Sequence, residues 1–422
     1  MKRVLMVAYH FPPLAGSSGI QRTLRFVQQL PALGWQPLVL TAHPMAYERT
    51  ADDLMAEVPD GTVVRRAWAL DTRRHLSIGG RYVAALARPD RWISWRYDAV
   101  RIGMQMIHEH KPDAIWSTYP LATAHLIGAE LQRRSGLPWI ADFRDPMAQD
   151  GYPEDPKTWQ SFQAIEQLAA QRTSACCFTT PGAVRMYRER YPLAANRMVM
   201  LENGYDEATF ARAEQALGQR EPLTPGVTTL LHSGIVYPAE RDPRQLFEAL
   251  GRLQLDRPDL AGRLRVRFRA AVAEQLLHEL ARQHGVETMV EILPAIGYAD
   301  ALAEMLRADG LLVMQASNCN EQVPAKVYEY LRAGRPIVCL SDPAGDTRDV
   351  LFRAGIAPVA MLDDAAAIQS LLISFLTGTS DAWLPRADAV AAASRDARSG
   401  ELSVLLNSVA ACEASQATAA KP

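Results

Sequence analysis

Two glutamates eight residues apart, Glu321 and Glu329, have the types and spacing that most directly suggest chemistry. They lie in the stretch NEQVPAKVYEYLRAGRPIV (320–338), with Lys326 between them. Carboxylates accept hydrogen bonds from sugar and ribose hydroxyls, whereas a lysine near a helix N-terminus attracts a diphosphate. The stretch therefore indicates a ligand that carries both hydroxyl and phosphate groups. A solvated helix face with Glu and Lys at helical spacing is the alternative.

The elements around this pair predict where its side chains lie. The preceding run DGLLVMQ (309–315) is short and apolar, which predicts a buried parallel strand, and PIVCL (336–340) predicts the next one. Between the strands, Pro324 suits the first turn of a helix and Gly334 suits its left-handed C-terminal cap. The first glutamate is then in the loop at the carboxyl edge of a sheet and the second on the helix. Ligands of open α/β sheets bind at that edge.

The stretch resembles the E-x7-E motif of the retaining, GT-B-fold glycosyltransferases of glycosyltransferase family four (group 1 type), in the branch that builds exopolysaccharides and cell-surface glycans. In that family the first glutamate faces the donor sugar and the second binds the nucleotide ribose, which implies these roles for Glu321 and Glu329. The resemblance also implies a catalytic role for Lys326 and donor contacts for Val323 and Pro324.

A second candidate for phosphate binding is the string HSGIVYPAERDPRQLFEAL (232–250). Gly234 ends a predicted strand and Arg241 precedes a predicted helix, where a guanidinium can bind a phosphate with two hydrogen bonds. The string resembles the family's phosphate-binding segment, a glycine followed by one basic residue and by another six positions later. Arg241 matches the second, Ile235 replaces the first, and we expect Lys326 to supply the missing cation. Pairing of Arg241 with a neighbouring surface acid is the alternative.

Residues on the acceptor side are expected in the first half of the chain. The loop HFPPLAGSSGIQRTLRF (10–26) resembles the glycine-rich first loop of these transferases, in which Gly16 and Gly19 let backbone N–H groups approach a ligand. An ordinary flexible loop is the alternative. Thr118 stands where many relatives have a histidine that lines the sugar site, so we expect it at the cleft.

Three charged residues, Asp142, Arg144 and Asp145, follow or end the predicted strand PWIAD (138–142). Charges at a sheet edge must either face a cleft or pair with one another. Family members of the exopolysaccharide type carry a similar Arg-Asp pair after this strand. A ligand-facing role and a structural ion pair both remain open.

Strand and helix signals alternate along all 422 residues, which predicts two α/β domains with doubly wound parallel sheets. The motifs specify the GT-B architecture, in which two Rossmann-like domains face a central cleft. The predicted divisions are an acceptor-binding domain (1–213), a polar linker (214–227), a nucleotide-sugar-binding domain (228–386), a C-terminal helix that packs back on the first domain (387–410) and a frayed tail (411–422).

Composition restricts the location and the partners of the chain. The formal net charge is −2, so no global field attracts nucleic acid and we expect no nucleic-acid partner. The amino terminus MKRVLMVAYHFPP stops after a strand-length apolar run, which predicts neither a signal peptide nor a membrane span. Five cysteines without CxxC spacing predict a reducing cytoplasm, with no disulfide framework and no zinc site.

The segment WALDTRRHLSIGGRYVAALARPDRWISWR (68–96) holds six arginines against two aspartates, interleaved with tryptophans, Tyr82 and leucines. Basic and interfacial aromatic residues together suit an anionic membrane surface. A plain surface helix and single-stranded nucleic acid are the alternatives. We expect the chain to lie peripherally on the inner face of the plasma membrane.

These motifs lead to one hypothesis and two rivals. The hypothesis is a retaining glycosyltransferase that moves a sugar from a nucleoside diphosphate sugar to a glycan acceptor, free or lipid-linked. No cofactor or metal is expected, because Arg241, Lys326 and a helix N-terminus supply the positive charge. The rivals are a GT-B-fold sugar-nucleotide epimerase or hydrolase, and an inactive scaffold protein of a polysaccharide assembly complex. The sequence does not specify donor, acceptor, linkage or oligomeric state.

Overall fold

The computed structural model describes residues 1–17, 19–378 and 381–419, and it divides them into two compact units. The first unit comprises Met1–Glu202 and the segment that begins at Arg395, and the second comprises Asn203–Ser394. The predicted first domain ended later, at residue 213. Helix α7 (Glu207–Leu217) belongs instead to the second unit and takes up the start of the predicted linker.

The first unit is built on a parallel sheet of seven strands in the order β3-β2-β1-β4-β5-β6-β7. The chain leaves β1 toward β2 on one side and later enters β4 on the other side. The switch point for ligands therefore lies at the carboxyl ends of β1 and β4. The strands are β1 (Lys2–Val7), β2 (Trp35–Ala42), β3 (Val63–Ala67), β4 (Ala114–Thr118), β5 (Trp139–Arg144), β6 (Ala175–Phe178) and β7 (Met198–Met200).

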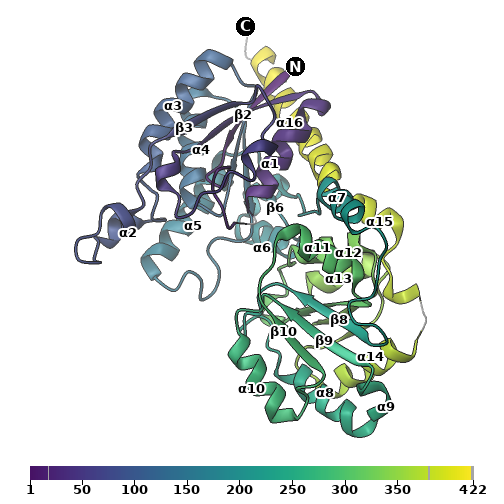
Figure 1. Cartoon of the computed structure of the whole chain (residues 1–422). Coiled ribbons are helices and arrows are strands. Elements are labelled where there is room, and N and C mark those ends of the chain that lie inside the picture. The colour runs from purple at the N-terminus through teal and green to yellow at the C-terminus, as the bar shows by residue number, and fades with distance from the viewer. Residues whose placement is uncertain (18, 379–380, 420–422) are drawn as a thin grey trace. The chain divides into compact units, whose positions relative to one another are not determined.

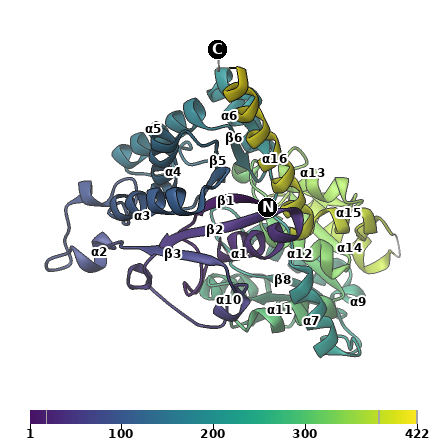
Figure 2. The same ribbon diagram turned by 90° about the horizontal axis from the view of Figure 1, so that it is seen from above.

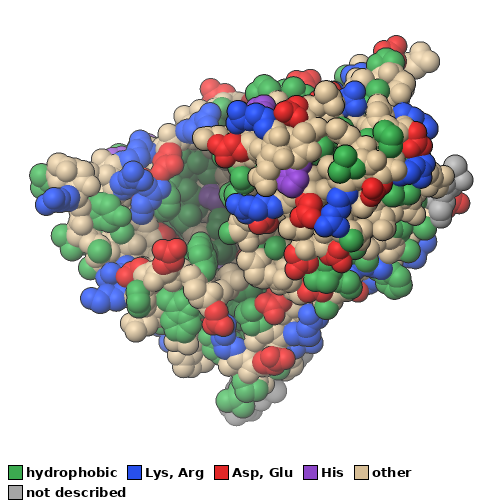
Figure 3. All heavy atoms as spheres, turned by 90° about the horizontal axis from the view of Figure 1, so that it is seen from below, with side chains coloured by type: hydrophobic (Ala, Val, Ile, Leu, Met, Phe, Trp, Pro, Cys, Tyr) green, Lys and Arg blue, Asp and Glu red, His purple; other side chains and the backbone are tan. Residues whose placement is uncertain are grey.

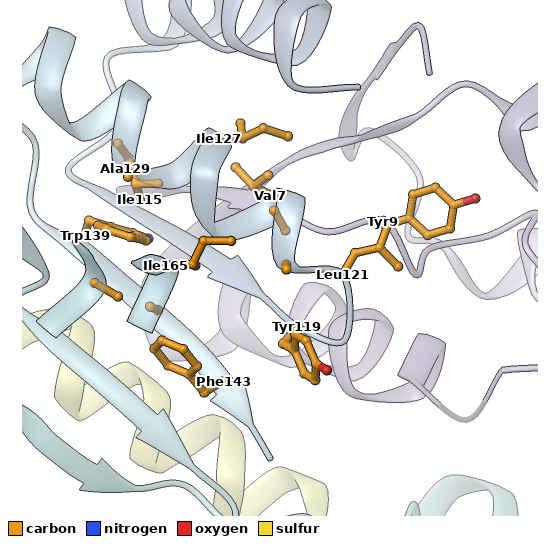
Figure 4. Close-up of a cluster of buried hydrophobic side chains, with 14 of the residues drawn as sticks. Val7, Tyr9, Ile115, Tyr119, Leu121, Ile127, Ala129, Trp139, Phe143 and Ile165 are labelled. Carbon is orange, nitrogen blue, oxygen red and sulfur yellow. The ribbon is translucent and has the colours of Figure 1, made fainter. Parts of the chain in front are cut away.

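Helices cover both faces of this sheet, because successive strand residues point to opposite faces and both sets are apolar. Val7 packs against Ile127 on the face covered by α3 to α6, whereas Met6 packs against Leu24 on the face covered by α1 and α16 (Figures 2 and 4). The helices are α1 (Gly19–Gln29), α2 (Thr72–His75), α3 (Trp95–His110), α4 (Ala122–Ser135), α5 (Pro156–Arg172), α6 (Pro181–Arg190) and α16 (Arg395–Ala419), with short 3-10 turns η1 (Leu30–Leu33), η2 (Pro44–Ala46), η3 (Met55–Glu57), η4 (Ala84–Ala87) and η5 (Pro192–Arg197).

The C-terminal segment forms two helices where the sequence predicted one. The short α15 (Ala387–Ala392) is part of the second unit, and α16 is part of the first. Helix α16 lies against α1, where Ser399 Oγ donates a hydrogen bond to Gln29 Oε1 at 2.6 Å. Its backbone stays helical to Ala419, so the predicted frayed tail begins too early, and residues 420–422 lie outside the described residues.

The second unit is built on a parallel sheet of six strands in the order β10-β9-β8-β11-β12-β13. The order again reverses at the first strand, so the carboxyl ends of β8 and β11 form the switch point. The strands are β8 (Thr228–Ser233), β9 (Leu264–Arg269), β10 (Val290–Leu293), β11 (Gly310–Gln315), β12 (Ile337–Ser341) and β13 (Val359–Ala360).

Helices also cover both faces of the second sheet. One apolar cluster joins the sheet to α8, α10 and α14, and the other joins it to α7, α11, α12 and α13 (Figure 1). The doubly wound parallel architecture predicted from the alternating pattern is confirmed in both units. The helices are α8 (Arg244–Asp256), α9 (Pro258–Ala261), α10 (Glu274–His284), α11 (Tyr298–Arg307), α12 (Lys326–Ala333), α13 (Asp346–Arg353) and α14 (Ala365–Thr377), with 3-10 turns η6 (Ser317–Cys319) and η7 (Asp381–Trp383).

Packing of α16 on the first unit yields a stability prediction. Leu402 is fully buried in the cluster with Leu24, so Leu402→Ala should lower the free energy of unfolding by about 2–5 kcal/mol. The matched control Val404→Ala, on the exposed side of α16, should change it by less than about 0.5 kcal/mol. Tryptophan fluorescence in urea reports this unit, which holds seven of the eight tryptophans. Equal effects of the two substitutions would contradict the packing.

Candidate functional site

The paired glutamates lie at the carboxyl edge of the second sheet. Strand β11 ends at Gln315, and the loop that follows carries Glu321 with an exposed side chain. Helix α12 then begins at Lys326 and has Glu329 in its first turn. The helix starts two residues later than predicted, so Pro324 precedes it and its carbonyl accepts a hydrogen bond from Val327 N at 2.9 Å.

The two ends of the motif have structural explanations. Gly334 caps α12 in the left-handed conformation, with φ of 64°, as its position predicted. Val323 was expected to contact the donor, but its side chain is buried in the apolar cluster under α12. Its role is therefore to anchor the loop that carries Glu321.

Strand β8 brings a histidine and a glycine against the start of α12. His232 is fully buried, and its Nε2 lies 3.0 Å from Lys326 Nζ. Gly234, just after the strand, has φ of 109°, and a Cβ added there would lie 3.2 Å from Lys326 Nζ. Ser233 N donates to Tyr330 Oη at 2.8 Å, which ties the end of β8 to α12. Lys326 thus lies beside the segment expected to bind phosphate.

Arg241 lies in the loop between β8 and α8. Its guanidinium lies over the ring of Tyr237, 5.4 Å from the centroid, and the carboxylate of Glu240 is 3.6 Å away, beyond hydrogen-bond distance. The other neighbouring acid, Asp242, pairs with Arg244 at 2.7 Å. Arg241 Nε is buried and has no hydrogen-bond partner among the described residues. The Arg241–Glu240 contact is therefore a long ion pair, so the pairing that the sequence left open is present, although its 3.6 Å separation exceeds hydrogen-bond distance.

The electrostatics of this edge favour an anion. Burial, and after it the charge of Arg241, lowers the pKa of Lys326 to about 7, against the opposing effect of Glu329. Burial also lowers the pKa of His232 well below its usual value, with smaller contributions from Lys326 and Arg241. Two cationic groups thus face each other beside a neutral imidazole. A bound dianion would relieve their repulsion.

Two residues of this site were missed or discounted from the sequence. Tyr298, the first residue of α11, donates its hydroxyl to Glu329 Oε1 at 2.7 Å, and no motif singles it out. For His232, near a predicted strand end, the sequence allows a place at the cleft, but a lone histidine more often completes local hydrogen bonds. Its position one residue before the end of β8 was the available signal, because that strand precedes the predicted phosphate segment.

At the edge of the first sheet, Asp142 is part of a buried ion pair. Arg22 donates from Nε and Nη2 to the two carboxylate oxygens, each at 2.9 Å, and Thr118 Oγ1 donates to Asp142 Oδ2 at 2.9 Å. All three side chains are buried. Of the two roles that the sequence left open for Asp142, these contacts favour the structural ion pair, and the hydroxyl of Thr118, expected at the cleft, is used in the same network. Arg22, 120 residues from Asp142, could not be identified as its partner from the sequence.

The remaining candidates of the first unit are two glycines and two charged residues, Gly16, Gly19, Arg144 and Asp145. Gly19 begins α1, and a Cβ added there would lie 2.5 Å from His10 Nδ1 and 3.0 Å from Arg144 Nη1. Gly19 therefore allows these two side chains to approach the start of α1. Arg144 has φ of 64°, and the side chain of Asp145 is exposed. Gly16 has φ of 78°, as a left-handed turn requires.

The arginine-rich segment 68–96 is not one surface helix. It contains the short helix α2 and the 3-10 turn η4, and Trp95 is fully buried. Trp92 donates its indole N–H to Ala46 O at 3.2 Å and packs on the core. Trp92 and Trp95 therefore have structural roles, whereas Trp68 is 58% exposed and stacks on the ring of His43.

Two searches for other site types were negative over the part of the chain that the structure describes. No group of three or more His, Cys, Asp or Glu side chains is placed to hold a metal ion among residues 1–17, 19–378 and 381–419. Within the same ranges, every helix is too short or too polar to cross a bilayer.

The chain was compared with models of protein families and with solved structures. Residues 18–204 match the model of the glycosyl transferase 4-like domain. The chain is similar to Anabaena Alr3699/HepE in complex with UDP-glucose (14% identity, 99% of this chain and 100% of that chain, TM-score 0.58). It is also similar to α,α-trehalose 6-phosphate synthase from Burkholderia multivorans (14% identity, 99% and 98%, TM-score 0.65).

A third similar structure is a putative UDP-N-acetylglucosamine 2-epimerase from Listeria monocytogenes (12% identity, 95% of each chain, TM-score 0.55). No curated protein sequence matches the chain. At these identities the structural likeness establishes a shared fold. With the two parallel sheets, it confirms the predicted GT-B fold.

The buried ion pair yields a stability prediction. Asp142→Ala should lower the free energy of unfolding of the first unit by about 3–5 kcal/mol, because Arg22 would stay buried without its carboxylate. Combining it with Arg22→Met should recover part of that loss. The exposed control Asp150→Ala should have an effect below about 0.5 kcal/mol. A nearly unchanged urea midpoint for Asp142→Ala would contradict a structural role.

Proposed function

We propose that this chain, whose residues 18–204 belong to the glycosyl transferase 4-like domain family, is a retaining glycosyltransferase of polysaccharide biosynthesis. It transfers a sugar from a nucleoside diphosphate sugar to a glycan acceptor. The observation that supports this most is the position of Lys326 beside Gly234 at the carboxyl edge of the second sheet, with Arg241 near enough to lower the pKa of Lys326. Two basic side chains suit the charge of a diphosphate, although Glu240 lies 3.6 Å from Arg241 and Glu329 acts on Lys326.

The donor would bind along this edge. Lys326 and Arg241 hold the diphosphate, Glu329 with Tyr298 binds the ribose hydroxyls, and Glu321 contacts the sugar. The bond from the anomeric carbon to the diphosphate oxygen breaks, and a bond to the acceptor hydroxyl forms on the same face. The acceptor proton passes to the departing phosphate oxygen, so no protein base is required. The two cations stabilise the leaving diphosphate, and the proposal needs no metal.

Two rivals remain distinguishable by experiment. The similarity to a 2-epimerase favours testing a sugar-nucleotide epimerase or hydrolase. Such an enzyme turns over a UDP- or GDP-sugar rapidly without an acceptor, whereas a transferase does not. A scaffold protein, suggested by Ile235 in place of a basic residue, would bind no nucleotide sugar.

The two glutamates should differ in their effects. Glu329→Ala should weaken donor binding about 10- to 100-fold, the loss of a hydrogen bond to a charged group, with a smaller effect on kcat. Glu321→Ala should instead lower kcat about 100- to 1000-fold, because its partner changes charge in the transition state. The exposed Glu279→Ala is the control. Calorimetric Kd and saturating kcat measure both, and equal effects on binding alone would contradict this division.

We further propose that the enzyme works in the cytoplasm at an anionic membrane surface, where it meets a lipid-linked acceptor. The four cysteines with described side chains are free thiols and buried, as suits a reducing compartment. Acidic and basic side chains are interspersed on the face shown in Figure 3, in keeping with a net charge of −2. No nucleic-acid partner is proposed.

The contact surface proposed for the membrane is the projecting segment 72–87, which contains no acidic residue. Arg73 and Arg81 are exposed, and so are the apolar side chains of Ile78 and Val83, at 88% and 65%. Cations beside exposed apolar groups complement an anionic bilayer surface. Trp92 and Trp95, which pack on the core, lie outside this segment.

Vesicle binding tests this partner. Arg73→Gln with Arg81→Gln should weaken binding to phosphatidylserine-containing vesicles about 30-fold, at roughly 1 kcal/mol for each arginine. The charge-matched control Arg263→Gln with Arg282→Gln changes two exposed arginines of the second unit and should bind as the native chain does. Co-sedimentation at two salt concentrations measures both. Equal binding to neutral and anionic vesicles would overturn the membrane proposal but leave the transferase proposal intact.

A further inference from the structure

His232 fixes Lys326 from the strand side. Its imidazole is fully buried, and Nε2 lies 3.0 Å from Lys326 Nζ. When Lys326 is an ammonium, Nζ is the donor and Nε2 the acceptor, so the ring is then neutral with its proton on Nδ1, a buried atom that has no hydrogen-bond partner among the described residues. This agrees with the pKa of His232, which burial and the two nearby cations lower well below its usual value. His232 therefore serves as an acceptor rather than as a third cation.

Gly234 fixes the same ammonium from the other side. A Cβ at this position would lie 3.2 Å from Lys326 Nζ and 3.5 Å from Cε, and φ of 109° is strained for any other residue. The hydrogen bond from one residue and the missing side chain of the other thus determine where Nζ lies. Neither constraint depends on Ile235, whose side chain is 37% exposed.

We propose that His232 is the positioning residue that holds the Lys326 amino group beside Gly234, so that it binds the diphosphate of a nucleotide sugar there as an ammonium. This inference rests on the proposed donor site. It explains how the chain replaces the basic residue absent at Ile235, with a cation that comes from another element of the fold.

The direction of the pH effect follows from the charges around Lys326. His232 faces it from β8, Arg241 from the loop after β8, and Glu329 from its own helix. Burial and Arg241 lower its pKa to about 7 in the free protein, against the opposing effect of Glu329. A bound diphosphate raises this pKa. Donor affinity should therefore be constant below about pH 7 and fall by up to roughly tenfold per pH unit above it.

Titration calorimetry with UDP-glucose and GDP-glucose, from pH 6 to 9, tests the proposal. Nucleotide sugars are suitable because their diphosphate lacks the terminal group that titrates near pH 6. Paired buffers of different ionisation enthalpy should reveal proton uptake on binding near pH 8. Lys326→Arg should bind without proton uptake and without the fall in affinity, since a guanidinium stays charged at all these pH values.

The His232 variants separate positioning from folding. His232→Leu should weaken binding about tenfold at pH 8 and move the fall in affinity to lower pH, because the ammonium loses its acceptor. His232→Gln, whose carboxamide oxygen can accept the same hydrogen bond, should retain most of the affinity. The exposed His278→Leu is the control.

The possible failures are distinguishable. Donor binding with no proton uptake, or with no sensitivity to His232→Leu, overturns this inference and leaves the donor site standing. If neither nucleotide sugar binds at any pH, the proposed function and this inference are both overturned.

Discussion

The repulsion between Lys326 and Arg241 is the interaction on which the account depends. Bringing two cations together in a partly dry site is unfavourable: burial first, and then the charge of Arg241, lower the pKa of the lysine to about 7. A fold tolerates such an arrangement when rigid elements hold it, and here the end of β8 and the start of α12 do so through His232, Gly234 and Tyr330. The repulsion is relieved by a ligand with two negative charges. The positions of these two basic side chains therefore support the proposal that the ligand carries a diphosphate.

The first unit provides the opposite case. Arg22 and Asp142 are also buried charges at the carboxyl edge of a parallel sheet, but each is matched by the other and by additional hydrogen bonds. When one partner of such a pair is removed, the other charge stays buried without compensation, and the free energy of unfolding falls. The same location in two similar units thus carries a hydrogen-bonded ion pair in one and, in the other, two basic side chains whose neighbouring carboxylates are less closely paired. Charge balance, rather than position alone, separates the two roles.

The sequence predicted what local patterns determine. Alternating apolar runs predicted both parallel sheets, and Gly334 predicted the end of α12, because strand burial and helix capping depend on residues close in the chain. Pairings between distant segments were not accessible. Arg22 and Asp142 are brought together by the order of the strands, and so are His232 and Lys326. Composition misled the interpretation of Trp95, since an aromatic residue among arginines suits a membrane surface and a core equally well.

Hydrogen–deuterium exchange of the native chain with and without a nucleotide sugar tests the central claim most directly. The account predicts slower exchange of backbone amides in two segments far apart in the sequence, 232–244 and 316–334, because both border the proposed diphosphate site. Lys326→Ala should remove this protection in both segments together. Protection elsewhere in the second unit, or none at a saturating concentration of a nucleotide sugar that binds, would contradict the placement of the donor at this edge.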